Sequence, residues 1–163
     1  MFNIGDYVVY KREICKIDEI KKNYVRGMDY YSMSNITDPS LIINVPINSS
    51  LLRHIISREE ALDIISKIAS IDVNVVDDKR LENEYKELMK SDKIEDLIKI
   101  IKITYKRCED RVNNGKKISE KDDNYFKKAE SIFYSEMSLA LNMTYDEAKE
   151  YIINNCCLLK YKI

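Results

Sequence analysis

The sequence predicts an α+β protein in which a small β-barrel precedes an all-α domain of about five helices. Before residue 52, β-branched and aromatic residues occur in short bursts, as at 7–10 and 41–45, between turn-forming Gly, Asp and Pro. After residue 57, apolar residues recur three and four apart, as at Ala61, Ile65 and Ile68. This change of period predicts two domains, 1–52 and 53–163.

The first domain is predicted to contain four or five short strands. Gly5-Asp6 forms a turn before a strand over 7–10, residues 14–20 alternate loosely between apolar and polar, and Gly27-Met28-Asp29 interrupts a hairpin. A turn at 38–40 precedes a strand over 41–45 that Pro46 closes. So many short strands in so few residues favour a small SH3- or Tudor-like barrel over a sandwich.

The helices of the second domain are predicted from their capping residues. Ser57 and Glu60 form a capping box for a helix to about residue 70, and Thr144 and Glu147 form another for a helix to about residue 155. Residues 72–76 are predicted to be a linker. Polar N-cap residues predict three more helices. They begin at Asp77-Asp78, Ser91-Asp92 and Ser119 and end near residues 90, 112 and 141, respectively.

Composition limits the classes of partner. The net charge is −1 and 34% of residues are charged, so a nucleic acid would have to meet a local basic patch. No apolar run approaches the roughly 20 residues that span a bilayer, and the first residues lack the pattern of a secretion signal. The chain has four cysteines, Cys15, Cys108, Cys156 and Cys157, and their spacing matches neither a disulfide framework nor a zinc site. This spacing predicts a cytoplasmic protein without a metal or cofactor.

Catalysis is not expected from this sequence. The single histidine, His54, lies in an apolar run without the partners that a catalytic triad needs, and a packing or capping role is favoured. The acidic pairs at 77–78 and 122–123 fall at helix starts, where the helix dipole explains them. Residues 115–117 favour a helix stop followed by solvated lysines over a phosphate loop, so no small-molecule ligand is expected.

One segment is locally basic. Between Lys99 and Lys117 seven basic residues face only two acidic ones. Lys99, Lys102 and Lys106 are spaced three and four apart, so they share one face of the predicted helix. Two interpretations remain open: a stripe that contacts phosphates, or an ordinary solvated face. A stripe of this kind would contact the nucleic-acid backbone without selecting a sequence.

Several motifs occur in an order that resembles the CarD/CdnL family of bacterial transcription regulators. Residues 2–10 are similar to the family's opening, an aromatic residue, a hydrophobic residue, Gly-Asp and Val-Val-Tyr. Residues 98–107 are similar to its long-helix segment, which ends in an aromatic and two basic residues. The junction and the fourth helix add Val45-Pro46, Leu52-Arg53, Ile56-Ser57, Glu59-Glu60-Ala61, Ile118-Ser119, Lys128-Ala129 and Ser135-Glu136.

The resemblance implies a transcription regulator, associated with the nucleoid through RNA polymerase. In the family a Tudor-like domain binds the polymerase β subunit, much as the corresponding module of transcription-repair coupling factor does. The helical domain contacts promoter DNA at the upstream edge of the bubble and modulates open-complex stability. On the matching positions the resemblance implies polymerase-binding residues Lys22, Asn23, Tyr24, Arg26, Ile42 and Asn44, and DNA-binding residues Lys79, Arg80, Lys106 and Arg107.

The chain departs from the family where DNA would be distorted. The family commonly wedges a tryptophan into the minor groove, but this chain has none, and the wedge position falls at Asp77 or Asp78. Segment 77–92 carries six acidic and four basic residues, so it should repel phosphate unless Lys79 and Arg80 project alone. We therefore expect weak, polymerase-dependent DNA contact, or alternatively a diverged interaction module that binds polymerase or another partner without DNA.

Overall fold

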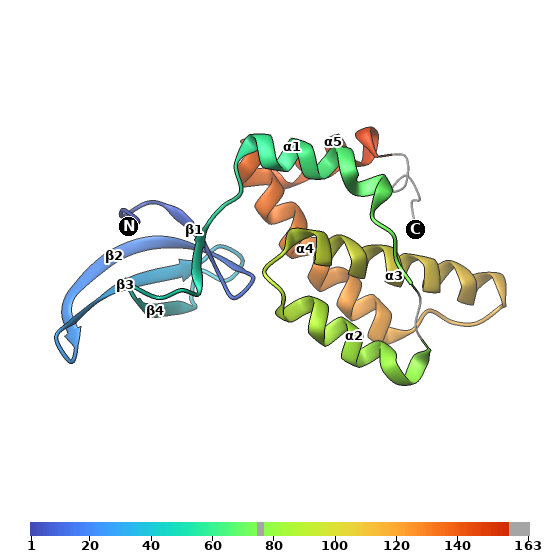
Figure 1. The fold of residues 1–163 in the computed structure, drawn as a ribbon, viewed down its shortest axis with the longest axis horizontal. Coiled ribbons are helices and arrows are strands. Elements are labelled where there is room, and N and C mark those ends of the chain that lie inside the picture. The colour runs from blue at the N-terminus through green and yellow to red at the C-terminus, as the bar shows by residue number, and fades with distance from the viewer. Residues whose placement is uncertain (75–76, 157–163) are drawn as a thin grey trace. The chain divides into compact units, whose positions relative to one another are not determined.

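The computed structural model describes residues 1–74 and 77–156, which form an α+β protein with an antiparallel sheet followed by helices (Figure 1). The chain divides into two compact units, Met1–Ile55 and Ile56–Ile163. The boundary predicted between residues 52 and 53 falls inside the last strand. The end of the predicted linker, 75–76, and the segment 157–163 with Cys157 lie outside the described residues.

The first unit is a five-stranded antiparallel sheet in the order β4-β3-β2-β1-β5. Closing a barrel requires the two edge strands to pair, and no pairing joins β4 to β5 among the described residues. The predicted closed barrel is therefore not formed; β5 is only three residues long and already pairs with β1. The strands are β1 (Tyr7–Tyr10), β2 (Glu13–Val25), β3 (Met28–Asn35), β4 (Ile42–Pro46) and β5 (Leu52–His54).

Two tight hairpins determine the register of the central strands. Lys11 and Arg12 join β1 to β2, and Arg26 and Gly27 join β2 to β3, each pair with positive φ at both residues. Positive φ at both central residues defines a type I′ turn, whose twist matches that of the strands it joins. The hairpin predicted around Gly27 is confirmed, and the loosely alternating segment 14–20 belongs to a longer strand, β2, that runs to Val25.

One face of the sheet carries the core of the first unit. Its side chains come from four strands, and the alternation of β4 places Val45 inward and its neighbour Asn44 outward. A bulge between Ile17 and Glu19 changes the alternation of β2, so that Ile20 also packs on the core. The buried members are Val8, Cys15, Ile17, Tyr31, Met33 and Val45.

The second unit is helical, and most predicted starts are confirmed. Ser57 and Thr144 form capping boxes with Glu60 and Glu147, and Asp77 and Ser119 are N-caps. The cap predicted at Ser91 is wrong: Ser91 ends the second helix, and the third begins after Lys93 without a side-chain cap. The helices are α1 (Arg58–Lys67), η1 (Ile68–Ser70), α2 (Asp78–Lys90), α3 (Ile94–Asn113), α4 (Glu120–Leu141) and α5 (Tyr145–Asn155).

Helix α4 organises the second unit. It packs against α1, α3 and α5, while α2 packs against α3, as the orange, yellow and green ribbons of Figure 1 show. The apolar face of α3 predicted from its periodicity is buried through Ile94, Leu97, Ile98 and Ile101. The C-terminal half of α3 and the first turns of α2 and α4 lie around one buried polar group, which is described below.

The turn residue Arg26 gives a first prediction. Asn-Gly is a preferred pair for a type I′ turn, whereas arginine at φ +51° is disfavoured. We expect Arg26→Asn to stabilise the β2–β3 hairpin by about 0.5–1 kcal/mol. Slower hydrogen exchange of the β2 and β3 amides would show this gain. Arg26→Ala is the control, because alanine keeps the unfavourable φ; equal slowing in both variants would contradict the explanation.

Candidate functional site

The outer edge of β4 offers main-chain groups to a partner. Asn35 N–H donates to the Leu41 carbonyl at 3.2 Å, and Ile47 N–H donates to the Asp29 carbonyl at 3.1 Å. Along an antiparallel ladder, hydrogen-bonded and non-hydrogen-bonded pairs alternate. Since residues 41 and 47 are both bonded to β3, the odd-numbered residues of β4 between them are bonded to β3 as well. The N–H and C=O groups of Ile42 and Asn44 therefore point away from the sheet.

Side chains next to this edge form a small exposed cluster. Lys21 Nζ donates to Asn44 Oδ1 at 3.1 Å and lies 4.9 Å from the centroid of the Tyr24 ring. Tyr24 packs edge to face on Tyr30, with ring centroids 5.5 Å apart. Ile42 is 51% exposed on the same edge strand. The cluster combines aromatic and aliphatic area with a cation and an amide, a composition suited to a protein partner.

Asp29 holds the end of the β2–β3 hairpin. Its carboxylate accepts from Lys22 Nζ at 2.7 Å and from Asn23 N–H at 3.0 Å. The hydrogen bonds from Lys22 and Asn23 hold the pKa of Asp29 below its ordinary value. Lys22 and Asn23, both predicted to face polymerase, thus shape the hairpin, and Arg26 lies in its turn.

The six residues predicted to bind polymerase are therefore not one patch with one role. The structure brings Tyr24 and Asn44 together around Lys21, a residue that was not predicted, and places Ile42 beside them on the edge strand. Lys22, Asn23 and Arg26 belong to the hairpin end. Lys21 could have been found from the sequence only with the register of β2 after its bulge.

A buried carboxylate links three helices of the second unit. Asp122, at the start of α4, is 2% exposed and accepts from Tyr85 Oη of α2 at 2.9 Å and from Arg107 Nε of α3 at 3.1 Å. Burial, together with the hydrogen bond to Asp122, raises the pKa of Tyr85 far above its ordinary value, so its hydroxyl stays a donor. Explaining Asp122 by the helix dipole alone was incomplete.

The predicted basic stripe of α3 is largely occupied by contacts within the protein. Lys99 Nζ pairs with Asp96 at 2.7 Å, and Lys102 Nζ donates to the Ile71 carbonyl at 2.6 Å. Burial lowers the pKa of Lys102 from its ordinary value. These two lysines are therefore engaged by groups of the helical unit itself. Lys106 remains exposed.

The four residues predicted to bind DNA differ in exposure. Lys79, Arg80 and Lys106 are exposed and make no ion pair with the described residues. The acidic neighbour Glu82 is paired with Lys86 and Lys121, whose hydrogen bonds lower its pKa to about 2. Arg107, in contrast, has a side chain only 13% exposed and pairs with Asp78 and Asp122.

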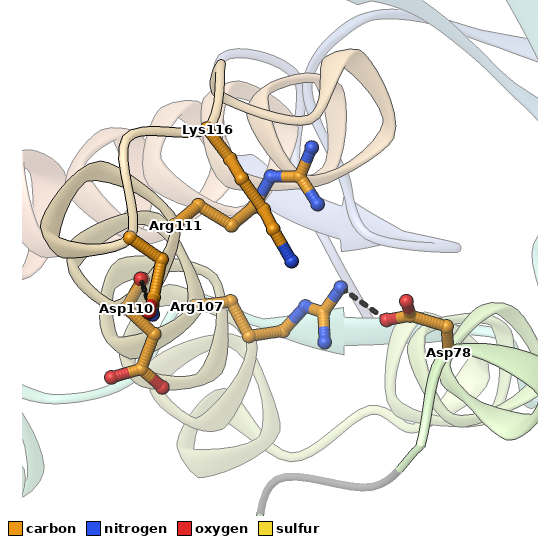
Figure 2. Close-up of a pocket in the computed structure, with 6 residues that line it drawn as sticks. Asp78, Arg107, Asp110, Arg111 and Lys116 are labelled. Atoms are coloured by element: carbon orange, nitrogen blue, oxygen red, sulfur yellow. Dashed lines mark hydrogen bonds and ion pairs between the residues drawn. The ribbon is translucent and has the colours of Figure 1, made fainter.

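A pocket of about 200 Å³ lies beside Arg107. The guanidinium groups of Arg107 and Arg111 and the ammonium of Lys116 converge there, with Asp78 on the opposite side (Figure 2). The Asp110 carboxylate points away from the three cations in the same view. Sequence reasoning missed Asp78, Arg111 and Lys116 as a group, although acidic 77–78 and basic 107–117 are complementary in charge.

Other candidate chemistry is accounted for by simple contacts. His54 lies in β5 with its ring 4.5 Å from that of Phe2. Burial, with the nearby charges of Glu13 and Asp18, raises the pKa of Cys15 to about 11, which disfavours its thiolate. No group of His, Cys, Asp and Glu in the described residues could hold a metal ion. None of the helices built by these residues combines the length and apolar character needed to cross a membrane.

No family model matches the chain, and no curated protein matches it either.

The Tyr85–Asp122 hydrogen bond gives a second prediction. Tyr85→Phe leaves one buried oxygen of Asp122 without its donor, and we expect a loss of about 1–2 kcal/mol in the free energy of unfolding. Urea denaturation followed by helical circular dichroism measures this loss. Tyr125→Phe is the matched control, because Tyr125 stacks on Tyr85 at 4.6 Å without a side-chain hydrogen bond among the described residues. Equal losses in the two variants would contradict the assigned role.

Proposed function

We propose that this protein is a transcription regulator that binds the β subunit of RNA polymerase and contacts promoter DNA at the upstream edge of the bubble, thereby modulating open-complex stability. In this proposal the first unit is a Tudor-like domain whose barrel stays open, and β4 is the polymerase-binding edge. The second unit carries the DNA contacts.

The observation that carries the proposal is the outward-facing main chain of β4. An exposed strand edge can accept a partner strand, with main-chain hydrogen bonds supplying affinity and neighbouring side chains supplying specificity. Ile42 and Asn44 have outward main-chain groups, and Tyr24 and Lys21 lie beside them. These residues are on the strands that the family resemblance assigns to polymerase.

The support for DNA contact is narrower. Lys79 and Arg80 at the start of α2 and Lys106 on α3 are exposed cations of one unit. The negative charge of the neighbouring Glu82 is compensated by ion pairs with two lysines. Three cations would contribute only a few phosphate contacts, so isolated binding should be weak and sensitive to salt. Tethering to polymerase would raise the effective concentration of these cations at the promoter.

A second candidate function has a specific observation in its favour. The charge of Arg107 is compensated by Asp78 and Asp122, and the wedge position of the family is acidic here. These features favour a protein-interaction module that binds polymerase, or another partner, without touching DNA. The two candidates share the β4 edge and differ in whether the exposed cations of the second unit act on the promoter.

The β4 edge gives a third prediction. Asn44→Pro removes an outward N–H, and proline is tolerated at such a position of an edge strand. We expect the variant to bind the purified polymerase β subunit about five- to tenfold more weakly, as the loss of one main-chain hydrogen bond would produce. Biolayer interferometry with the full chain measures the affinity.

Asn44→Thr is the control for this experiment, because it removes the amide side chain and keeps the N–H group. Near-normal binding by the threonine variant and weak binding by the proline variant would support strand pairing. Absence of wild-type binding at about 10 μM, weaker than most specific complexes, would refute both candidate functions as polymerase binders. Circular dichroism of each variant checks that the sheet is retained.

The exposed cations give a fourth prediction. Arg80→Glu combined with Lys106→Glu should shift the lifetime of the open complex at least severalfold toward its value without the protein, since two phosphate contacts become repulsive. A filter-binding decay assay with promoter DNA and polymerase measures the lifetime. Arg107 is left intact, because its reversal would place a second carboxylate beside buried Asp122.

The control is Lys67→Glu combined with Lys128→Glu, which changes the net charge by the same amount at exposed positions on other helices. If the Arg80/Lys106 variant retains polymerase binding and leaves the lifetime unchanged, the DNA contact is refuted and the interaction-module alternative is favoured. If both double variants shift the lifetime equally, the effect belongs to overall charge and the assigned surface is wrong.

A further inference from the structure

The pocket beside Arg107 is built from three elements of the helical unit. Arg107 and Arg111 project from the last turns of α3, Lys116 from the loop that follows, and Asp78 from the first turn of α2. Arg111 Nε donates to the Lys117 carbonyl at 2.7 Å, and Lys116 N–H donates to the Arg111 carbonyl at 2.8 Å. The loop therefore holds Arg111 and Lys116 next to each other.

The Asp78 carboxylate lies opposite three cations of the pocket, and one of these cations, Arg107, is also paired with buried Asp122. Figure 2 shows the Lys116 ammonium between the guanidinium groups of Arg107 and Arg111, with the Asp78 carboxylate facing them. The hydrogen bond from Arg107 and its charge, and more weakly the charges of Arg111 and Lys116, hold the pKa of Asp78 below its ordinary value. Asp110 also lines the pocket, but its carboxylate points away. One carboxylate thus faces three cations.

Asp78 is the replaceable member of this group. Its side chain is 78% exposed, so its pair with Arg107 at 2.7 Å is a surface ion pair, a kind that contributes little to stability. Arg107 would keep its bond to buried Asp122 at 3.1 Å if Asp78 moved away. Movement of Asp78 would therefore expose an anion site whose deepest cation stays in position.

We propose that this pocket binds a phosphate group, which displaces the Asp78 carboxylate and is held by Arg107, Arg111 and Lys116. Two guanidinium forks and one ammonium suit the several oxygens of a phosphate better than the two oxygens of a carboxylate. The volume of about 200 Å³ greatly exceeds the 10–15 Å³ that one water needs. No small-molecule ligand was expected from the sequence. The pocket forms only where three segments that are separate in the sequence meet in the fold.

The phosphate can come from a small molecule or from a nucleic-acid backbone, and the chemistry of the pocket is the same for both. Binding of free phosphate does not rest on the proposed function. Binding of a backbone phosphate does, because Arg107 is among the residues assigned to promoter DNA. The first experiment therefore contains neither polymerase nor DNA.

Inorganic phosphate is titrated into the full chain at pH 8, and backbone and arginine side-chain NMR signals are followed. We expect saturable shifts at Arg107, Arg111 and Lys116 with a dissociation constant on the order of 1 mM, typical of a small exposed ion site. Asp78→Asn should tighten binding at least threefold, because the competing carboxylate is gone. Lys116→Gln should weaken it at least threefold.

Asp110→Asn is the matched control, since it changes the net charge as Asp78→Asn does at a carboxylate that points away. The proposal is overturned if the shifts do not saturate, or if Asp110→Asn tightens binding as much as Asp78→Asn. Lys116→Gln, at an exposed loop position, keeps the test valid should changes at Arg111 disturb the loop.

A second titration, with short duplex DNA in place of phosphate, identifies the source. One result is that Asp78→Asn tightens DNA binding more than Asp110→Asn does and also steepens the fall of the binding constant with salt concentration by the equivalent of about one phosphate contact. In that case the pocket accepts a phosphate of the DNA backbone. If the two variants bind DNA alike while phosphate binding still distinguishes them, the ligand is a small phosphate compound. Failure of the phosphate titration alone removes this inference and leaves the proposed function standing.

Discussion

The helical unit depends on the buried carboxylate of Asp122. A carboxylate that is 2% exposed needs partners, since an unpaired buried charge is costly. Tyr85 and Arg107 provide them, and in doing so they bring α2 and α3 to the start of α4. The ion pair with Asp122 holds the largely buried Arg107 side chain in place. Arg107 in turn lines the pocket that it shares with Arg111 and Lys116.

Part of the basic segment of α3 is likewise engaged in contacts within the helical unit. Lys102 donates to a backbone carbonyl after α1, and Lys99 and Arg107 form ion pairs with nearby aspartates. Of the residues assigned to DNA, Lys79 and Arg80 on α2 and Lys106 on α3 are left exposed to the solvent. The weak, polymerase-dependent DNA contact that we propose would follow from this distribution of charge.

Local signals predicted the α+β class and most helix starts, because a capping box or an N-cap aspartate acts within four residues of chain. They could not predict the open sheet, since closure depends on whether β4 and β5 meet. Nor could they predict the role of Asp122, whose partners lie 15 and 37 residues away in sequence. Ser91 shows the local limit: its hydroxyl accepts from Lys93 N–H, but the residue ends one helix and does not start the next.

Pro46 gives the exposed edge of the sheet a built-in stop. A strand that continues as a flat, unprotected edge can recruit copy after copy and lead to aggregation. Here the last residue of β4 has no amide hydrogen, so the ladder that a visiting chain could build on Ile42 and Asn44 cannot be extended past it. An edge bounded in this way is a poor template for fibre growth, and any strand that paired with it would be short.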